Sequence, residues 1–391
     1  MPFYYKLGKI PRVKHTTFYK DDGKSLYREE LISSKGFSGV YSNVYHFHLP
    51  TAVKSVKELL PVKDTSWPEA PVLYYHFFTD NKKTSGNFIN ARDEYLVNPH
   101  CKISTAFVTE DTEDFYRNAY GAEFIFIHHG QGKLLSHFGV LPFTDGDQLV
   151  IPRATTYQLK FDDYIHNKIM IIESDTAYEI SKHYKNEYGQ MEEHAPYCER
   201  DFRPPEYLDP KNEKGEFRII LKANDRLFEH IVPNHPFDVV GWDGFLYPFA
   251  FNIKDYHPKV GRIHLPPPVH LLYKTGHFIL CNFVPRLFDF YETAIPAPYF
   301  HSNIDSDEVL YYVEGDFMSR KGIKEGSITL HPGGMPHGPQ PGKTEESIGA
   351  KETSEYAIMI DTYSPLRPTT NVRDTIDEDY AKSWLENGKG K

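Results

Sequence analysis

The sequence predicts an all-β fold with a minor helical part, organised as two similar β domains. Short apolar stretches alternate with turn residues along most of the 391 residues, a rhythm typical of antiparallel sandwiches and barrels. Aromatic residues make up 15% of the chain and prolines number 29, which favours strands and turns over a helical bundle. At about 150 residues per domain, the length is enough for two large domains.

The expected elements follow in order along the chain. Residues 1–100 mix short aromatic runs with polar breaks, which indicates strands joined by loops. Residues 104–175 repeat short apolar segments with glycine and aspartate turns between them, and residues 181–216 then read as a long polar connection. The β pattern resumes from 216 and continues past Asp361. Only residues 372–385 have helical character.

Charge and cysteine content limit the possible partners and the compartment. Lys and Arg total 44 against 54 Asp and Glu, a formal charge of −10 with no long basic run, so neither nucleic acid nor an anionic membrane is an expected partner. No stretch approaches the roughly 20 apolar residues of a membrane span, and the N-terminus lacks a signal-peptide pattern. Cys101, Cys198 and Cys281 are too scattered for a disulfide framework. These features predict a cytoplasmic location.

Two motifs in the second β region carry the chemistry. The first begins at His301, reaches Glu308 seven residues later and ends at Gly315. The second fits a pattern of glycine, five residues, proline, any residue, glycine, two residues, histidine, and it ends at His337. From average residue frequencies, its four fixed positions are expected by chance on the order of 0.005 times in this chain.

The spacing of these residues resembles the paired motifs of the cupin superfamily, which lie on neighbouring strands of a small β-barrel and direct metal ligands into its mouth. The usual first motif has a second histidine where this chain has Asn303, so the resemblance leaves His301, Glu308 and His337 as ligands. Two imidazoles and one carboxylate form a facial triad suited to non-haem Fe(II), whereas Zn²⁺ is more often tetrahedral. Manganese stays an alternative.

The first β region repeats the pattern in degraded form, at a separation of 180 to 185 residues. Glu123 takes the place of Glu308, but Tyr116 and Tyr157 stand where His301 and His337 belong. The sequence therefore predicts a two-domain bicupin of double-stranded β-barrel or jelly-roll type. Its degenerate, metal-free N-terminal copy is expected within residues 1–250, and a catalytic cupin followed by a C-terminal helix within 251–391.

Two other pairs of histidines are expected to have no metal. His128 and His129 lie in the degraded copy and are expected to be strand residues rather than ligands. His46 and His48 lie two apart in an expected strand, but no nearby glutamate or third histidine supports a site there.

Around the second motif the resemblance narrows to the homogentisate 1,2-dioxygenase family. It is carried by residues 236–244, 247–254, 283–286, 298–301 and 330–339. The resemblance implies an Fe(2+) enzyme that opens the aromatic ring of homogentisate with O2 to give maleylacetoacetate, in the catabolism of tyrosine and phenylalanine. It also implies a homo-oligomer built from trimers.

Individual roles follow from the same resemblance. His301, Glu308 and His337 match the iron ligands, with His337 also close to substrate, and His264 matches the active-site histidine. His331, six residues before His337, matches a substrate-contacting histidine. The alternatives are a surface histidine for His264 and, for His331, simple support of the ligands.

Two departures from the family leave the substrate open. The carboxylate follows His301 by one residue more than in familiar members, which a bulge would absorb. Phe317 stands where those members have a substrate-contacting tyrosine, so Tyr299, Tyr311 or Tyr312 is expected to supply the hydroxyl.

Arg286 is a candidate for binding the substrate carboxylate, with a structural salt bridge as its alternative role. The rival functions are a cupin dioxygenase for gentisate or another hydroxylated aromatic acid, and a bicupin that binds a metal or small ligand without turnover.

Overall fold

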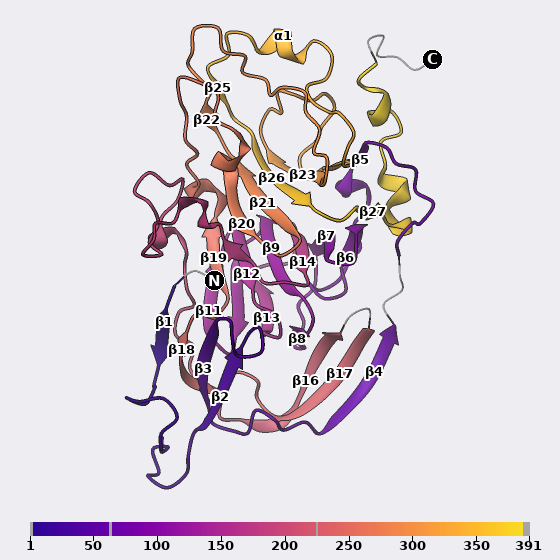
Figure 1. The fold of residues 1–391 in the computed structure, drawn as a ribbon. Helices are drawn as coiled ribbons and strands as arrows, with labels where there is room; N and C mark the ends of the chain where they lie inside the picture. Colours follow the sequence, from indigo (N-terminus) through magenta and orange to yellow (C-terminus); the bar gives the residue numbers. More distant parts are fainter. Residues whose placement is uncertain (1–2, 62–64, 224–225, 386–391) are drawn as a thin grey trace.

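The computed structural model describes residues 3–61, 65–223 and 226–385. Nearly all of its regular structure is β, with the single α-helix of the described residues, α1, at Lys343–Ser347 (Figure 1). The predicted all-β class is confirmed. The strands form three seven-stranded sheets, one four-stranded sheet and one two-stranded sheet.

Two of the large sheets belong mainly to the N-terminal half. In strand order the first contains β19 (Phe249–Asn252), β12 (Asp147–Ile151), β9 (Ala122–His129), β14 (Asn167–Ser174), β7 (Cys101–Val108), β6 (Arg92–Val97) and β27 (Arg367–Pro368). The second contains β11 (Gly139–Phe143), β10 (Gly132–Ser136), β13 (Thr156–Phe161), β8 (Phe115–Asn118), β16 (Lys214–Ala223), β17 (Arg226–Asn234) and β4 (Ser55–Pro61). Strands β16, β17 and β4 extend away from the barrel at the bottom of Figure 1.

The third large sheet belongs to the C-terminal half and carries the candidate site. Its strands are β15 (Glu179–Ile180), β20 (Leu271–Lys274), β21 (Phe278–Phe283), β26 (Tyr356–Thr362), β23 (Asp307–Glu314), β24 (Ile328–His331) and β5 (Tyr75–Phe77). The four-stranded sheet contains β1 (Tyr5–Gly8), β18 (Val239–Gly244), β3 (Tyr41–His46) and β2 (Arg28–Ser33), and the two-stranded sheet contains β22 (Arg286–Leu287) and β25 (Glu352–Thr353).

The internal repeat seen in the sequence is present in the structure as two sheets with the same order of strands. The N-terminal run β12-β9-β14-β7 corresponds to the C-terminal run β24-β23-β26-β21. The registers agree as well, because Glu123 faces Ile151 in one copy and Glu308 faces His331 in the other. The two copies are therefore the two barrels of a bicupin.

The two halves exchange edge strands. Residues 75–77 form β5 at the edge of the C-terminal sheet, and Arg367–Pro368 forms β27 at the edge of the N-terminal sheet. Strand β19 spans the expected boundary at 250 and pairs with β12. The division into 1–250 and 251–391 stays a prediction, and several strand pairings cross it.

The two barrels pack against each other sheet to sheet, which follows from strand alternation. On β9, Ile125 and Ile127 face the core of the N-terminal barrel, while Phe124 and Phe126 join the core shared with the C-terminal sheet. On β23, Tyr311 meets Phe126 with ring centroids 6.0 Å apart. The opposite face of β23 is left for the interior of the C-terminal barrel.

The C-terminal segment corrects one expectation. In place of one helix over 372–385, the described residues form two 3-10 turns, Thr370–Thr375 and Tyr380–Lys382. Val372 has non-helical angles (φ −115°, ψ 15°), and the β-branched Thr375 and Ile376 follow it, so a continuous α-helix does not propagate. The buried side chains of Val372, Thr375 and Tyr380 fix the segment against the barrels instead.

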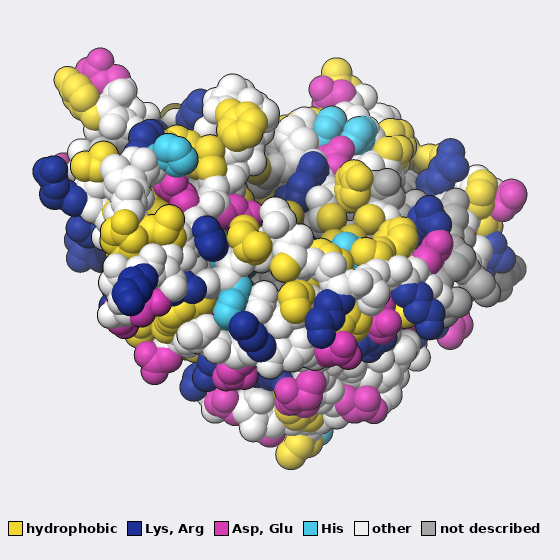
Figure 2. All heavy atoms as spheres, turned by 90° about the horizontal axis from the view of Figure 1, so that it is seen from below, with side chains coloured by type: hydrophobic (Ala, Val, Ile, Leu, Met, Phe, Trp, Pro, Cys, Tyr) yellow, Lys and Arg dark blue, Asp and Glu magenta, His cyan; other side chains and the backbone are white. Residues whose placement is uncertain are grey.

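Side chains of both charge signs are interspersed over the face shown in Figure 2, as the balanced composition predicts. No helix among the described residues is both long enough and apolar enough to span a membrane.

Candidate metal centre

Three predicted ligands meet at one end of the C-terminal barrel. Glu308 lies at the start of β23, while His301 and His337 pair through a short antiparallel bridge with two backbone hydrogen bonds of 2.9 Å. The His301 Nε2 atom lies 3.4 Å from Glu308 Oε2, and the His337 Nε2 atom lies 3.3 Å from Glu308 Oε1. Ligand atoms about 2.1 Å from one metal and at right angles lie about 3 Å apart, so these spacings fit a shared ion.

The tautomers of both histidines suit metal binding. The Nδ1 atom of His301 lies 3.2 Å from the Tyr299 carbonyl, and that of His337 lies 3.0 Å from the Met335 carbonyl. A carbonyl only accepts, so Nδ1 carries the proton and Nε2 presents its lone pair toward Glu308. Such carbonyl partners orient metal-binding imidazoles in the same way.

The surroundings of the His337 Nε2 atom test whether the site fits a cation. This atom is buried and has no hydrogen-bond partner among the described residues, although it faces a carboxylate oxygen. A lone pair held against an anionic oxygen is unfavourable unless a proton or a metal lies between them. The donor set therefore fits a divalent metal that prefers imidazole and carboxylate ligands.

Glu308 is held in its ionised form. Burial alone opposes the charge, but interactions with His301, His331 and His337 outweigh it and lower the pKa of Glu308 well below its usual range. An anionic carboxylate at the floor of a cavity is the form that binds a cation. Asp361 on β26 pairs in register with Glu308. Its burial and the Glu308 charge raise its pKa to about 7.

His331 lies behind the candidate ligands rather than in the open space in front of them. Its Nδ1–H donates to Glu308 Oε1 at 2.8 Å, and its Nε2 accepts from the Tyr380 hydroxyl at 3.0 Å. Burial lowers the pKa of His331 to about 4, which agrees with this neutral form. Both ring nitrogens are thus occupied, and the geometry favours support of Glu308 over contact with substrate.

A cavity of about 400 Å³ opens in front of the triad. Its lining includes His301 and Glu308 together with the catalytic and substrate-binding candidates His264, Arg286, Tyr299 and Phe317. A site of this size admits a single-ring aromatic acid. The structure therefore brings these residues together around one space, while His331 and His337 are absent from its lining.

His264 lies at the side of the cavity on the loop before β20. Its Nδ1 lies 3.0 Å from Asp289 Oδ2, and both residues line the cavity. Donation from Nδ1–H to that carboxylate leaves Nε2 as a proton acceptor. The side chain is 53% exposed, so a general-base role depends on a bound substrate to exclude water.

Arg286 has a partner already. Its Nη1 lies 3.5 Å from Glu355 Oε1, and both side chains are largely buried. Burial raises the pKa of Glu355 and the Arg286 charge opposes that shift. The structure thus gives Arg286 the salt bridge that was its alternative role.

The tyrosines named as replacements for the missing hydroxyl occupy different places. Phe317 packs its ring 4.6 Å from Tyr312, and both line the cavity, as does Tyr299. Strand alternation turns Tyr311 to the other face of β23, where its hydroxyl contacts His128 Nδ1 at 2.6 Å. Tyr312 and Tyr299 are the two that face the cavity.

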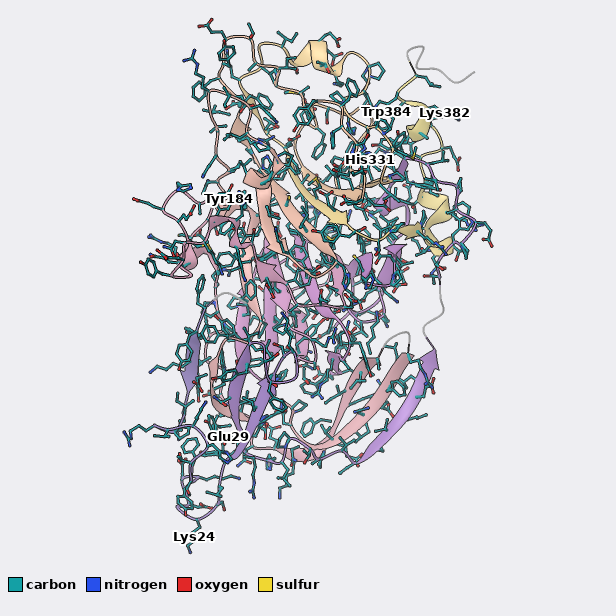
Figure 3. All side chains as sticks on the ribbon, viewed as in Figure 1. Lys24, Glu29, Tyr184, His331, Lys382 and Trp384 are labelled. Carbon is teal, nitrogen blue, oxygen red and sulfur yellow. The ribbon has the colours of Figure 1, made fainter. Side chains whose placement is uncertain are left out.

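Sequence reasoning missed several residues around the site. Arg320 lines the cavity and its Nε is buried without a hydrogen-bond partner among the described residues. Tyr380 and Trp384 come from the C-terminal segment and cover His331, with the Trp384 ring 6.1 Å from the His331 ring (Figure 3). Nothing local in the sequence signals these contacts, because they join segments about 50 residues apart.

A loop inside the first motif spans the distance from His301 to Glu308. Residues 302–306 form a connection between the His301 bridge and β23, and the backbone of Asn303 accepts from Gly334 N at 2.6 Å. Strand β23 has no bulge at Glu308, so this connection, and not a bulge, spans the seven residues from His301 to Glu308.

In the N-terminal barrel, an arginine occupies the corresponding place. Arg92 Nη1 lies 2.6 Å from Glu123 Oε1, and its guanidinium carbon lies 4.9 Å from the centre of the Tyr116 ring. The Tyr157 hydroxyl donates to Glu123 at 2.8 Å. Tyr116 and Glu123 thus contact the Arg92 guanidinium, and Tyr157 contacts the Glu123 carboxylate.

His128 and His129 lie at the end of β9 and share Glu325 as a partner.

Comparisons with known proteins agree with this architecture. The family model described as Homogentisate 1,2-dioxygenase N-terminal matches residues 87–253, and the corresponding C-terminal model matches residues 275–389. A protein of Saccharolobus solfataricus named "Putative dioxygenase SSO1533" is 39% identical over 387 residues, covering 98% of this chain and 99% of that protein.

Two further similarities are more distant. The homogentisate 1,2-dioxygenase of Bradyrhizobium diazoefficiens is 23% identical over 342 residues, which cover 83% of this chain and 74% of that enzyme. A solved cupin 2 conserved barrel domain protein from Leptotrichia buccalis is 11% identical with a TM-score of 0.32, over 70% of this chain and 88% of its own. The two family models and the full-length relative confirm the resemblance seen in the motifs: the chain belongs to the homogentisate 1,2-dioxygenase family of metal-dependent dioxygenases.

Proposed function

We propose that this protein is an Fe(2+)-dependent ring-cleaving dioxygenase that opens homogentisate with O2 to give maleylacetoacetate. The observation that carries the proposal is the triad of His301, Glu308 and His337, two of whose members open onto the 400 Å³ cavity. Three protein ligands leave coordination positions free for substrate and O2, as in non-haem iron oxygenases. We also propose a cytoplasmic homo-oligomer built from trimers, in keeping with the family.

The metal would supply a place where a ring oxygen and O2 bind side by side and exchange electron density. This chain's own residues orient the substrate and move its proton. Asp289 holds His264 with Nε2 free, so His264 accepts or shares the proton of the ring hydroxyl. His331 and Tyr380 fix Glu308 from behind the cavity.

The substrate's carboxylate has a better partner in Arg320 than in Arg286. Arg286 is neutralised by Glu355, whereas Arg320 has no carboxylate within ion-pair distance among the described residues. Arg320 donates to the Gly338 carbonyl, and its Nε is without a partner. A cavity-lining guanidinium with an unused donor suits an acidic substrate.

A second substrate class is favoured by one observation. Phe317 lines the cavity where a tyrosine would bond a substrate group, so the enzyme has less means of selecting homogentisate over gentisate or another hydroxylated aromatic acid. The acid group and the ring hydroxyls are common to these compounds.

The test is oxygen uptake by protein reconstituted with Fe(2+), over homogentisate, gentisate and their analogues without the carboxylate. We expect turnover of homogentisate that depends on iron and is lost in His337→Ala. His194→Ala is a matched control, because His194 is an exposed histidine 3.0 Å from Glu192. Turnover confined to gentisate or another acid would show that this acid, and not homogentisate, is the substrate. Absence of oxygen uptake with every compound would contradict the proposed dioxygenase activity.

A further inference from the structure

Each barrel has a second acidic residue beside its motif glutamate. Asp361 on β26 faces Glu308 on β23, just as Glu173 on β14 faces Glu123 on β9. The common order of strands makes these two pairs equivalent. The partners of Asp361 and of Glu173 can therefore be compared directly.

The two second carboxyl groups differ in their partners. Both oxygens of Glu173 are bonded, because Lys222 Nζ donates to Oε1 at 2.6 Å and Asn118 Nδ2 donates to Oε2 at 2.9 Å. Asp361 Oδ1, in contrast, is buried without a hydrogen-bond partner among the described residues, and the Asp361 carboxyl group forms no ion pair with any of them. A buried polar atom without a partner is costly. This arrangement indicates that a molecule entering the site supplies a partner for the Asp361 carboxyl group.

Strand alternation turns Asp361 toward the catalytic cavity. Glu308 and Leu310 alternate along β23, Met359 and Asp361 alternate along β26, and all four line this cavity. Residues directly opposite each other on neighbouring strands have Cβ atoms about 5 Å apart. Asp361 is thus next to Glu308 on the cavity wall.

Asp361 lies beside the candidate metal position without belonging to the triad. The candidate ligand atoms of His301, Glu308 and His337 lie within 4.8 Å of one another, and Asp361 is outside this group. A hydroxyl bound in an open position beside Glu308 can pair with the Asp361 carboxyl group, because a hydroxyl both donates and accepts. A substrate carboxylate in the same place would meet the charge of the ionised Glu308.

We propose that Asp361 is a positioning residue, which forms a hydrogen bond with a ring hydroxyl of the substrate beside Glu308. The inference rests on the proposed function, which supplies a hydroxylated aromatic acid as substrate. Phe317 offers this cavity no hydroxyl, so Asp361 provides polar recognition of the ring that Phe317 cannot give.

Arg320 then fixes the direction of the substrate. Arg320 and Asp361 line the same cavity, and each has a buried polar atom without a partner among the described residues. The guanidinium only donates hydrogen bonds and suits the acid group, whereas the carboxyl group of Asp361 suits the hydroxyl. The substrate is therefore expected to bind with its ring hydroxyl toward Asp361 and its carboxylate toward Arg320.

The test measures binding in the absence of O2 to the full chain loaded with Co²⁺, by the visible absorption of Co²⁺ and by titration calorimetry. Homogentisate is compared with phenylacetate, which has the same acid group and no ring hydroxyl. Asp361→Leu should weaken homogentisate binding by roughly 10- to 100-fold, the effect of one hydrogen bond to a carboxyl group, and leave phenylacetate binding unchanged. Asp361→Asn should retain most of the affinity for homogentisate, because an amide still pairs with a hydroxyl.

Two controls separate this role from metal binding and from general damage. All variants should hold as much Co²⁺ as the wild type, since Asp361 is outside the group of three ligands. Asp21→Leu makes the same substitution at an aspartate whose side chain is 86% exposed, and it should bind both acids as the wild type does. Asp361→Ala gives the same comparison if Asp361→Leu does not load Co²⁺.

The outcomes distinguish this proposal from the proposed function. Equal weakening of homogentisate and phenylacetate in Asp361→Leu, or a loss in Asp361→Asn as large as that in Asp361→Leu, overturns the hydrogen bond to the ring hydroxyl. A wild type that binds homogentisate no better than phenylacetate overturns it as well. Binding of homogentisate without oxygen uptake by the Fe(2+) protein rejects only the dioxygenase activity, and the comparison of variants then still decides the role of Asp361.

Discussion

The guanidinium of Arg92 lies 2.6 Å from Glu123 and takes the place in the N-terminal barrel that the candidate metal takes beside Glu308 in the C-terminal barrel. The replacement is consistent in charge, because a buried carboxylate in either barrel needs a cation next to it. Glu173, which faces Glu123 across β14 and β9, has its own cation in Lys222 at 2.6 Å. Tyr157 donates a hydrogen bond to Glu123, and it stands at the position where the C-terminal barrel has the imidazole of His337.

Because Arg92 already neutralises Glu123, iron is predicted to bind only in the C-terminal barrel, beside Glu308. His337→Ala should lose bound iron, because two remaining ligands hold a metal far more weakly than three. Glu123→Gln should keep the iron content of the wild type, since in the wild type the Glu123 carboxylate binds Arg92 and not a metal. Metal analysis of both proteins after reconstitution decides the matter, and iron lost from Glu123→Gln as well as from His337→Ala would contradict the assignment of one site.

The ion pair of Arg92 with the buried Glu123 predicts a loss of stability when the arginine is removed. Arg92→Met removes the cation and leaves Glu123 charged and buried, so the free energy of unfolding should fall by about 3–5 kcal/mol. Arg92→Met combined with Glu123→Gln should recover part of that loss, because the unpaired charge is gone. Denaturant unfolding of the four proteins in this cycle gives the coupling energy, and a coupling near zero would show that the pair is not energetically linked.

The parts of this architecture that depend on local sequence patterns could be predicted from the sequence, and those that depend on long-range contacts could not. The strand rhythm and the two motifs are local patterns, so the repeat and the candidate ligands His301, Glu308 and His337 could be named without coordinates. The Arg92 replacement could not be named, because Arg92 lies 31 residues before Glu123 in the chain and no local pattern links them. Arg320 and Tyr380 were missed for the same reason, and the edge strands β5 and β27 depend on long-range pairing.

His46 predicts a pH dependence of stability. Burial alone lowers the pKa of His46, but hydrogen bonds to Asp238 at 2.7 Å and Glu30 at 3.0 Å outweigh it and raise the pKa to about 9. A raised pKa in the folded state contributes stability that is full below pH about 6.5 and is lost as the pH rises through 9. The contribution is at most about 3 kcal/mol.

The measurement compares wild type with His46→Gln at pH 6 and pH 9.5. The difference in unfolding free energy between the two proteins should shrink at the higher pH, because only the wild type loses a proton there. A difference that is constant with pH would show that His46 is neutral in the folded protein.

Arg320 predicts selectivity for acidic substrates. Arg320→Met should lower kcat/KM for a carboxylate-bearing substrate by roughly 10- to 100-fold, the cost of one charge-assisted hydrogen bond. The analogue without the carboxylate should be turned over equally by both proteins. Arg286→Met is the comparison, since Arg286 is paired with Glu355, and an equal loss on both substrates would show that Arg320 acts only through packing.

His264 predicts a separation of chemistry from metal binding. Its Nδ1 is held by Asp289 at 3.0 Å, and its Nε2 is the acceptor available to a ring hydroxyl. His264→Ala should keep the wild-type iron content and lower kcat by about 10²- to 10⁴-fold, because only a proton-transfer contact is lost. Asp289→Asn should have a smaller effect of the same kind, since it disturbs the tautomer but leaves the ring in place. Iron content and oxygen uptake measured on the same preparations distinguish the possibilities: iron lost from His264→Ala would make the residue structural, and undiminished turnover would remove it from the reaction.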